Sequence, residues 1–225
     1  MRIKTFLLAG TVAVASIGAA TAANANPISI GLSQTAGPGG ITTVATGDGS
    51  ATFAGSFGTF DSNFISVMGT PPLAEPTLAT ASIAVNSTTP GSQTLYIYVT
   101  EQNLTSLNGV SNLVSGFTSN LFTGAVQSVD EYSFVDPSNG LWGGSQLAST
   151  TFTSAPASNS VIAATADISG PFSETAQFII RLNDVGSVND TITIATPVPE
   201  PTAIALLGMA FVGFGMMRRH KHSLG

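Results

Sequence analysis

The stretch TAQFIIRL, residues 175–182, indicates most clearly which class of fold this chain adopts. Apolar side chains recur in it at every second position, at Ala176, Phe178, Ile180 and Leu182, and polar ones stand between them, at Thr175, Gln177 and Arg181. Because successive side chains of a β-strand point to opposite faces, a period of two is the pattern of a strand with one buried face. We therefore predict a half-buried strand here.

The same period continues through most of residues 26–196. Alternating runs rich in β-branched and aromatic residues predict further strands at 28–32, 53–57, 65–67, 79–86, 95–100 and 192–194. Glycine, proline and asparagine clusters separate them, and Asn139-Gly140 predicts a hairpin that joins 130–135 to 147–153. Only 103–113 and 114–121 are also compatible with helix. Strands spaced by roughly 8 to 15 residues predict a single antiparallel β-sandwich of the Ig-like or jelly-roll type.

The charge of this body, residues 26–196, excludes several classes of partner. It contains one basic residue, Arg181, against eleven acidic ones, a net charge of −10. Nucleic-acid binding requires several lysines or arginines to displace counterions, so no nucleic-acid partner is expected. The chain also has no cysteine, and its stability must come from burial without disulfides.

The N-terminal 25 residues have the organisation of a signal peptide. Arg2 and Lys4 precede an apolar stretch over 6–20, which is shorter than a membrane span requires. Ala23 and Ala25 then place small residues at the positions that signal peptidase recognises. We expect cleavage after Ala25 and export of the body.

The C-terminal segment, residues 197–225, combines three features in a fixed order. A proline-flanked carboxylate, Pro199-Glu200-Pro201, precedes an uncharged stretch over 202–217, and the basic residues Arg218, Arg219 and Lys221 follow. The apolar side chains of 202–217 lie all round a helix, which predicts burial in lipid, and the basic end is expected on the cytoplasmic side. We predict a transmembrane helix in the inner membrane.

This three-part segment resembles the PEP-CTERM sorting signal of Gram-negative bacteria that make exopolysaccharide, also known as an ice-binding-protein C-terminal domain. The resemblance implies recognition by an exosortase and cleavage near Pro199-Glu200-Pro201. The body would be anchored in the periplasm and then reach the cell surface or extracellular matrix. The chain is therefore expected to be an exported, non-enzymatic envelope or matrix protein associated with exopolysaccharide or biofilm.

The body offers little catalytic chemistry. It has no histidine or lysine that could serve as the base for a serine or threonine nucleophile. A glycoside hydrolase that uses two carboxylates among Asp130, Glu131 and Asp136 is given the least weight, because adjacent strand residues face opposite sides. No enzyme activity and no cofactor are expected.

Oxygen-rich segments around Asp130 and Asp136, and around Asp184 and Asp190, have the ligand type that Ca²⁺ prefers. No EF-hand spacing accompanies them, and Asp and Asn also stabilise turns without a metal. We favour turn chemistry and predict no metal site at these four residues.

Two aromatic residues leave a binding function open. Trp142, the sole tryptophan, stands between glycine-containing turns, and Tyr132 is near it in the sequence. Such rings can contact a sugar, but a single tryptophan can equally cap a core. A carbohydrate- or ice-binding module on the same scaffold is therefore the alternative function, although only Thr191-Ile192-Thr193 has the Thr-x-Thr spacing of an ice-binding ladder.

Overall fold

The computed structural model describes residues 25–107, 112–165 and 168–197. This part of the chain consists of antiparallel strands with one short 3-10 helix, η1 (Pro38–Gly40). The strands are β1 (Pro27–Ser33), β2 (Thr42–Asp48), β3 (Ser50–Phe57), β4 (Phe60–Met68), β5 (Thr77–Ser87), β6 (Gln93–Ser106), β7 (Asn112–Asp136), β8 (Ser145–Phe152), β9 (Ala157–Ala164) and β10 (Ser169–Ala195). The predicted all-β antiparallel class is confirmed.

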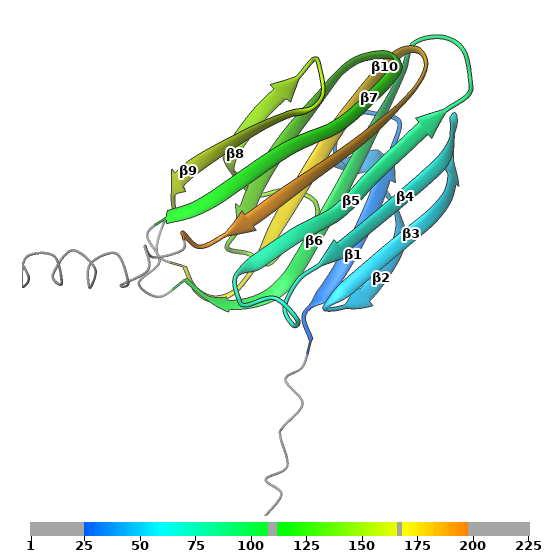
Figure 1. Ribbon diagram of the computed structural model, residues 1–225. Coiled ribbons are helices and arrows are strands. Elements are labelled where there is room, and N and C mark those ends of the chain that lie inside the picture. Colours follow the sequence, from blue (N-terminus) through cyan, green and yellow to red (C-terminus); the bar gives the residue numbers. More distant parts are fainter. Residues whose placement is uncertain (1–24, 108–111, 166–167, 198–225) are drawn as a thin grey trace, which may run out of the picture.

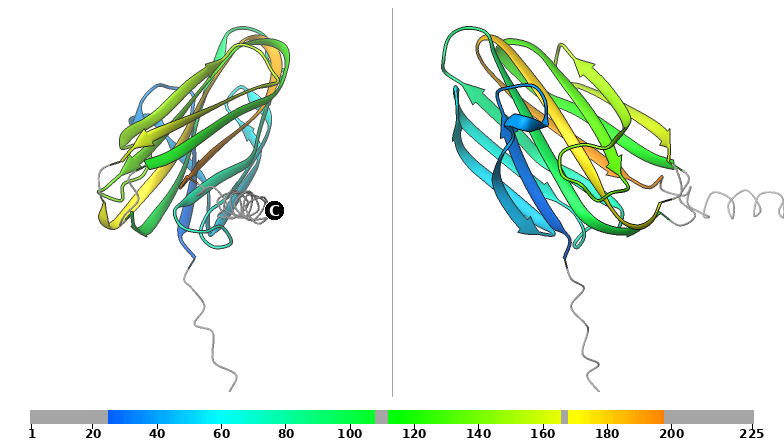
Figure 2. Two further views of the ribbon diagram at one scale, coloured as in Figure 1. Left: turned by 60° about the vertical axis from the view of Figure 1, so that its left-hand side comes forward. Right: turned by 180° about the vertical axis from the view of Figure 1, so that it is seen from behind.

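Two very long strands, β7 and β10, turn one continuous sheet into two layers (Figure 1). The first part of β10 pairs with β6 and its last part pairs with β5, while β7 follows β10 on the other side through both parts. The first layer therefore contains β2, β1, β6, the start of β10, the end of β7 and β8. The second layer contains β3, β4, β5, the end of β10, the start of β7 and β9. Figure 2 shows both layers edge-on in its left view.

Glycines mark the bend between the layers. Gly124 of β7 has φ +71°, and a side chain there would lie 2.3 Å from the carbonyl oxygen of Val185. It stands opposite Gly186 of β10, where the register shifts. Close approach of two backbones is a role that only glycine fills without strain.

The core lies between the layers and follows the predicted alternation. Phe178 and Ile180 are fully buried, whereas Gln177 and Arg181 on the opposite face of β10 are partly exposed. The largest fully buried side chains are Phe60, Phe117, Phe172, Phe178, Ile28, Ile30, Leu32, Ile65, Leu78, Ile83, Leu95 and Ile97. Each contributes about 1.5–3 kcal/mol on burial, so this core is the main source of stability.

The predicted hairpin is confirmed, since β7 and β8 pair antiparallel on either side of Asn139. The helical alternative is wrong, because 103–106 belongs to β6 and 112–121 belongs to β7. Within 113–119 every second residue faces the core. Two of these residues, Ser115 and Ser119, are polar, so the sequence does not show the apolar alternation that indicates a strand. The runs 176–182 and 192–194 were expected as separate strands, and both belong to β10.

The described chain ends leave from the same end of the sandwich (Figure 1). There the backbone N–H of Asn26 donates to the carbonyl oxygen of Thr70 at 2.8 Å. The signal peptide apart from Ala25, the Pro199-Glu200-Pro201 tripeptide, the membrane helix at 202–217 and the basic tail lie outside the described residues. Within the described ranges, no helix has the length and apolarity needed to cross a membrane.

Candidate functional site

The outer face of the first layer carries all three tyrosines and the sole tryptophan of the chain. One row crosses four strands in register: Tyr132 of β7 stands opposite Gln177 of β10, Gln177 opposite Tyr98 of β6, and Tyr98 opposite Gly31 of β1. Residues that stand opposite each other share a face of the sheet. We call this surface the aromatic face and define it by Tyr96, Tyr98, Tyr132, Phe134 and Trp142.

Trp142 lies on this face because Gly31 leaves room for its ring. A side chain at Gly31 would place its Cβ 2.9 Å from Cη2 of Trp142. The ring of Tyr98 meets the indole edge-to-face, with centroids 6.1 Å apart and planes at 64°. The backbone N–H of Trp142 donates to Thr100 Oγ1 at 3.3 Å. The indole is partly exposed and is not a member of the core between the layers.

Hydrogen bonds fix the loop that presents Trp142, residues 137–144. Asp136 accepts from the backbone N–H of Ser138 at 2.8 Å and of Gly140 at 3.1 Å. Asn139 accepts on its side chain from the N–H of Asn103 at 2.8 Å, which ties the loop to β6. Bonds from the side chain and backbone of Ser138 hold the pKa of Asp136 below its usual value. Asp136 therefore organises the turn that positions the tryptophan.

The other half of the aromatic face is built around Tyr132. Its ring stacks on Phe134 with centroids 6.2 Å apart and planes at 22°. Tyr132 and Tyr98 are two strands apart, which separates their backbones by about 10 Å, and Gln177 lies between them. Burial raises the pKa of Tyr98, and a hydrogen bond with Gln177 opposes this shift. The partly exposed amide of Gln177 is thus flanked by the partly exposed ring of Tyr132 and the buried ring of Tyr98.

An ion pair closes one end of the face. The guanidinium of Arg181 binds the carboxylate of Asp130, and this hydrogen bond raises the pKa of Arg181. Thr151 also donates to Asp130, at 2.9 Å. The single basic side chain of the described residues is therefore neutralised by its neighbour.

The carboxylates considered for glycoside hydrolysis, Asp130, Glu131 and Asp136, do not lie together in the structure. Asp130 faces outward while Glu131 is fully buried on the other side of β7. Asp130 and Asp136 are six residues apart on this strand, about 20 Å at 3.3 Å per residue. Glycosidase carboxyl groups are roughly 5–9.5 Å apart, so these two do not have the spacing for that reaction.

The metal-ligand candidates also remain separate. Asp184 accepts from the backbone N–H of Val185 at 2.8 Å, whereas Asp190 is fully buried. Within the described ranges, no group of three or more His, Cys, Asp or Glu side chains could hold a metal ion. The four residues considered as calcium ligands thus serve in turns, in an ion pair or in the core.

Sequence reasoning did not predict that four carboxylates are buried between the layers, although it had named two of them as candidate site residues. They are Glu101, Glu131, Glu174 and Asp190. Burial, followed by repulsion from Asp190, raises the pKa of Glu131 to about 9. Burial also raises the pKa of Glu101 to about 7 and that of Asp190 to about 7. Each acid stands two residues from a buried apolar residue of its own strand, which is the signal that could have placed it inside.

Burial and the neighbouring Glu101 raise the pKa of Glu174 well above its usual value. These two glutamates form one pair, and Glu131 and Asp190 form another. The first pair lies near the end of the sandwich where the chain ends emerge, and the second comes from facing layers in mid-strand.

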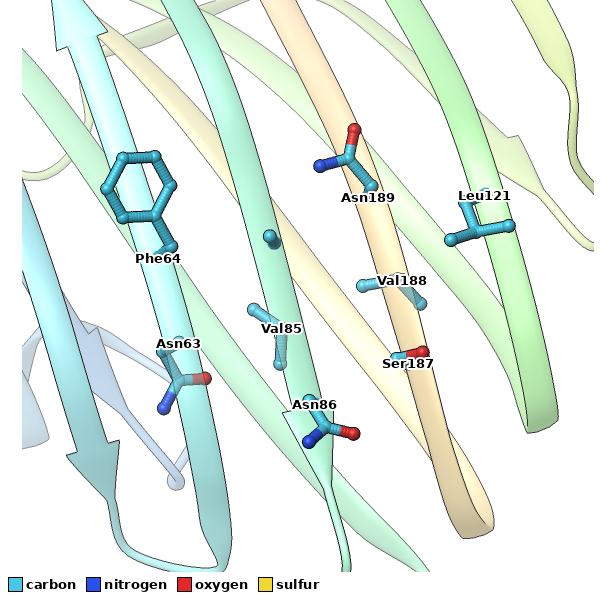
Figure 3. A pocket seen from close by; sticks show the side chains of 9 residues that line it. Asn63, Phe64, Val85, Asn86, Leu121, Ser187, Val188 and Asn189 are labelled. Carbon is cyan, nitrogen blue, oxygen red and sulfur yellow. The ribbon is translucent and has the colours of Figure 1, made fainter.

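The outer face of the second layer differs from the aromatic face. It contains a shallow hollow of about 340 Å³, seen in Figure 3. Phe64, Ala84, Asn189 and Leu121 cross its four strands in register. Phe64 is 48% exposed and Leu121 is 49% exposed. The small side chain of Ala84 forms the floor between them, and the lining residues are uncharged.

Thr191 and Thr193 also lie on the second layer. Thr191 stands opposite Thr118, but the neighbours of Thr193 are Gly116 and Ala79. The cross-strand neighbours of Thr191 and Thr193 therefore do not form a regular array of threonines with them.

The chain carries a PEP-CTERM protein-sorting motif at residues 197–219. This signal marks the protein for export and membrane-anchored sorting. No curated protein matches the chain.

Solved structures with a similar strand arrangement include three carbohydrate-binding modules. One recognises mannan, with 10% identity, a TM-score of 0.34, and coverage of 65% of this chain and 86% of the module. A second was solved with β-1,4-galactotriose, with 14% identity, a TM-score of 0.30, and coverage of 58% and 81%. The third is a family 11 module from Clostridium thermocellum with a mixed-linked tetrasaccharide, with 11% identity, a TM-score of 0.31, and coverage of 76% and 98%.

Proposed function

We propose that this chain is an exported, non-enzymatic protein of the cell envelope or extracellular matrix whose body binds polysaccharide through the aromatic face. An exosortase cleaves it near Pro199-Glu200-Pro201 after signal peptidase has removed residues 1–25. The observation that carries the binding function is the row in which Tyr132, Gln177 and Tyr98 stand in register beside Trp142.

The chemistry of this row suits a neutral sugar chain. A pyranose ring has apolar C–H faces that pack on aromatic rings, and its hydroxyls hydrogen-bond to amides and hydroxyls placed between such rings. The rings of Tyr132 and Trp142 provide the first kind of contact and Gln177 provides the second. Because Arg181 is already paired with Asp130, the described part of this face offers no unpaired basic side chain for an anionic ligand.

The rigidity of the face supports the same proposal. Trp142 is held by Thr100, by the ring of Tyr98 and by the loop bonds of Asp136. A ring that is already fixed loses little conformational entropy when a ligand binds. The exosortase substrate then delivers a preorganised binding face to the envelope or matrix.

Affinity electrophoresis of the mature protein in gels containing soluble polysaccharides tests the binding function. We expect wild type to be retarded by a glycan and Trp142→Ala to migrate without retardation. The matched control is Phe64→Ala, which removes a half-exposed ring from the second layer and should leave retardation unchanged. Lack of retardation of wild type by every glycan, including the exopolysaccharide of the host, would refute it.

Intact-mass measurement of protein from its host, with and without the exosortase gene, tests the sorting. Both strains should yield protein that begins at Asn26. We expect a C-terminus near residues 199–201 only when the exosortase is present. Protein ending at Gly225 in both strains contradicts the proposal, and this outcome is independent of the binding result.

A further inference from the structure

The buried pair Glu101 and Glu174 has the features of a cation site. These residues stand directly opposite each other on β6 and β10, and both are 0% exposed. Side chains opposite each other on antiparallel strands have Cβ atoms about 4.5–5.5 Å apart. Two carboxylates at this distance repel each other unless a proton or a cation lies between them.

Several oxygens at this place have no partner. Glu101 Oε1 accepts from the backbone N–H of Thr70 at 2.7 Å and from Asn26 Nδ2 at 3.2 Å. By contrast, Glu101 Oε2, both carboxylate oxygens of Glu174 and Thr70 Oγ1 are buried without a hydrogen-bond partner among the described residues. Since native proteins pair nearly all buried polar atoms, such a cluster indicates a bound ion or water.

The backbone around the pair is shaped to keep these oxygens together. On β6, Gln102 and Asn103 stand opposite the single residue Ser173, which is a β-bulge, and Asn103 has φ +62°. Gly69 approaches the pair from the loop after β4, and a Cβ there would lie 2.2 Å from Glu101 Oε2. Bulges and glycines of this kind are common where a backbone approaches a ligand closely.

No basic side chain of the described residues neutralises the pair. Arg181 is occupied by Asp130. Glu75, whose carboxylate binds the backbone N–H of Thr105, adds a further negative charge that acts on both Glu101 and Glu174. The electrostatics therefore favour a bound cation at this end of the sandwich.

We propose that Glu101 and Glu174 bind a calcium ion, with the hydroxyl of Thr70 and water among the remaining ligands. The available donors are oxygens, which excludes the nitrogen and sulfur sites typical of zinc. Calcium accepts six to eight oxygens in irregular geometry, whereas magnesium requires a near-ideal octahedron. The ion would join β6, β10, the loop after β4 and the segment at Asn26, where the ends of the body emerge.

The pair Glu131 and Asp190 provides an internal control. It is equally buried and its oxygens also lack partners among the described residues. However, Glu131 stands between Phe178 and Thr150, and Asp190 between Ile83 and Ser119, all within strands. Because both acids come from strand interiors, without a described loop glycine such as Gly69 against their carboxylates, this pair is expected to retain a proton instead of a metal.

Metal content and thermal unfolding of the full-length chain in mild detergent at pH 7.5 test this assignment. After gel filtration in calcium buffer, elemental analysis should find one calcium per chain. At a calcium concentration a hundredfold above Kd, we expect Tm to lie about 5–10 °C above its value in EGTA. Magnesium at the same concentration should give a smaller shift.

The variants Glu101→Gln and Glu174→Gln should bind no calcium and show no calcium-dependent shift. In EGTA both variants should melt at or above the wild-type temperature, because each substitution removes the repulsion within the pair. In calcium both should melt below wild type, and this reversal of the order of Tm values distinguishes metal binding from a general structural role. Glu131→Gln should keep the full shift. Absence of bound calcium in wild type, equal stabilisation by magnesium, or a retained shift in either folded variant would overturn the proposal.

Discussion

The outer face of the first layer presents a cluster of aromatic rings around an amide, whereas that of the second layer presents Phe64 beside a hollow floored by Ala84. The same two strands contribute to both faces, since β7 provides Tyr132 to one and Leu121 to the other, and β10 provides Gln177 and then Asn189. The two outer faces therefore differ in their outward-facing side chains and not in the strands that form them. Binding and folding can accordingly be changed separately by substitution.

The largest effect is expected from removing two rings of the aromatic face together. Tyr132→Ala with Trp142→Ala should weaken polysaccharide binding at least about fivefold, because each aromatic contact contributes about 0.5–1.5 kcal/mol beyond buried area. Isothermal titration with a soluble oligosaccharide measures this. The matched double variant Phe64→Ala with Leu121→Ala should bind as wild type does, and equal losses in the two double variants would remove the distinction between the faces.

A smaller loss of binding is expected from a substitution at Gly31, against which the ring of Trp142 packs. Gly31→Val places atoms where Trp142 Cη2 and Ile41 Cγ2 now lie, 2.9 and 2.5 Å from the new Cβ. Overpacking of this kind costs about 1–3 kcal/mol of stability, and displacement of the indole should also weaken binding. Denaturant unfolding and titration measure the two effects.

The control for this substitution is Gly116→Ala on the second layer, where an added Cβ meets nothing within 4 Å. It should leave both stability and binding close to wild type. Unchanged binding by a folded Gly31→Val protein would show that the position of Trp142 does not matter.

Glu131 and Asp190 come from the inner faces of the two layers. The raised pKa values of these two acids predict that the stability of the protein depends on pH. The folded-state pKa values, about 9 and about 7, exceed those of the unfolded chain, so the folded state prefers the protonated acids. Stability is thus fully present below about pH 4 and falls as pH rises through 7 and 9. Glu131→Gln should stabilise the protein by about 1–2 kcal/mol at pH 8 and much less at pH 4.5.

Urea unfolding at both pH values measures the difference between Glu131→Gln and wild type. Asp61→Asn, at an exposed position, is the control and should show no such trend. A Glu131→Gln protein that is less stable than wild type at pH 8 would show that the ionised side chain has a favourable partner.

The smallest effect is expected at the ion pair that borders the aromatic face. The side chain of Arg181 is 33% exposed, so solvent screening limits the value of its pair with Asp130 to under about 1 kcal/mol. Arg181→Gln should lower stability slightly and change binding less than about twofold. A tenfold loss of affinity would instead indicate an acidic ligand that contacts Arg181.

The strands and the hairpin at Asn139 could be predicted from the sequence because they depend on local patterns. Alternation fixes which residues of a strand share a face, and Phe178 and Gln177 lie on the sides that it predicts. The continuity of β10 could not be predicted in this way. Asn183, Asp184 and Gly186 have the composition of a loop, yet the strand continues through them because β7 pairs with Leu182 and Gly186 on either side of the unpaired residues 183–185.

The candidate site depends on register, which single-sequence patterns do not contain. The sequence offered Tyr132 and Trp142 as sugar contacts but gave no reason to group them with Tyr98, since they come from three segments that pairing brings to one face. Buried acids such as Glu101 and Glu174 were missed for a different reason. An acidic residue in a strand is normally assumed to face solvent. Glu101 and Glu174 are each two residues from a buried apolar residue, Val99 and Ala176 respectively, and this spacing places both acids on the inner face.

The most direct test of the account is an NMR titration of isotope-labelled mature protein with oligosaccharides from the exopolysaccharide of its host. Trp142 is the sole tryptophan, so its indole N–H signal is unambiguous. We predict that this signal and the side-chain amide of Gln177 shift with added sugar while Asn189, on the opposite face, stays unchanged. Shifts confined to the hollow around Asn189 and Phe64, or no shifts at all, would contradict the assignment of the aromatic face as the binding site.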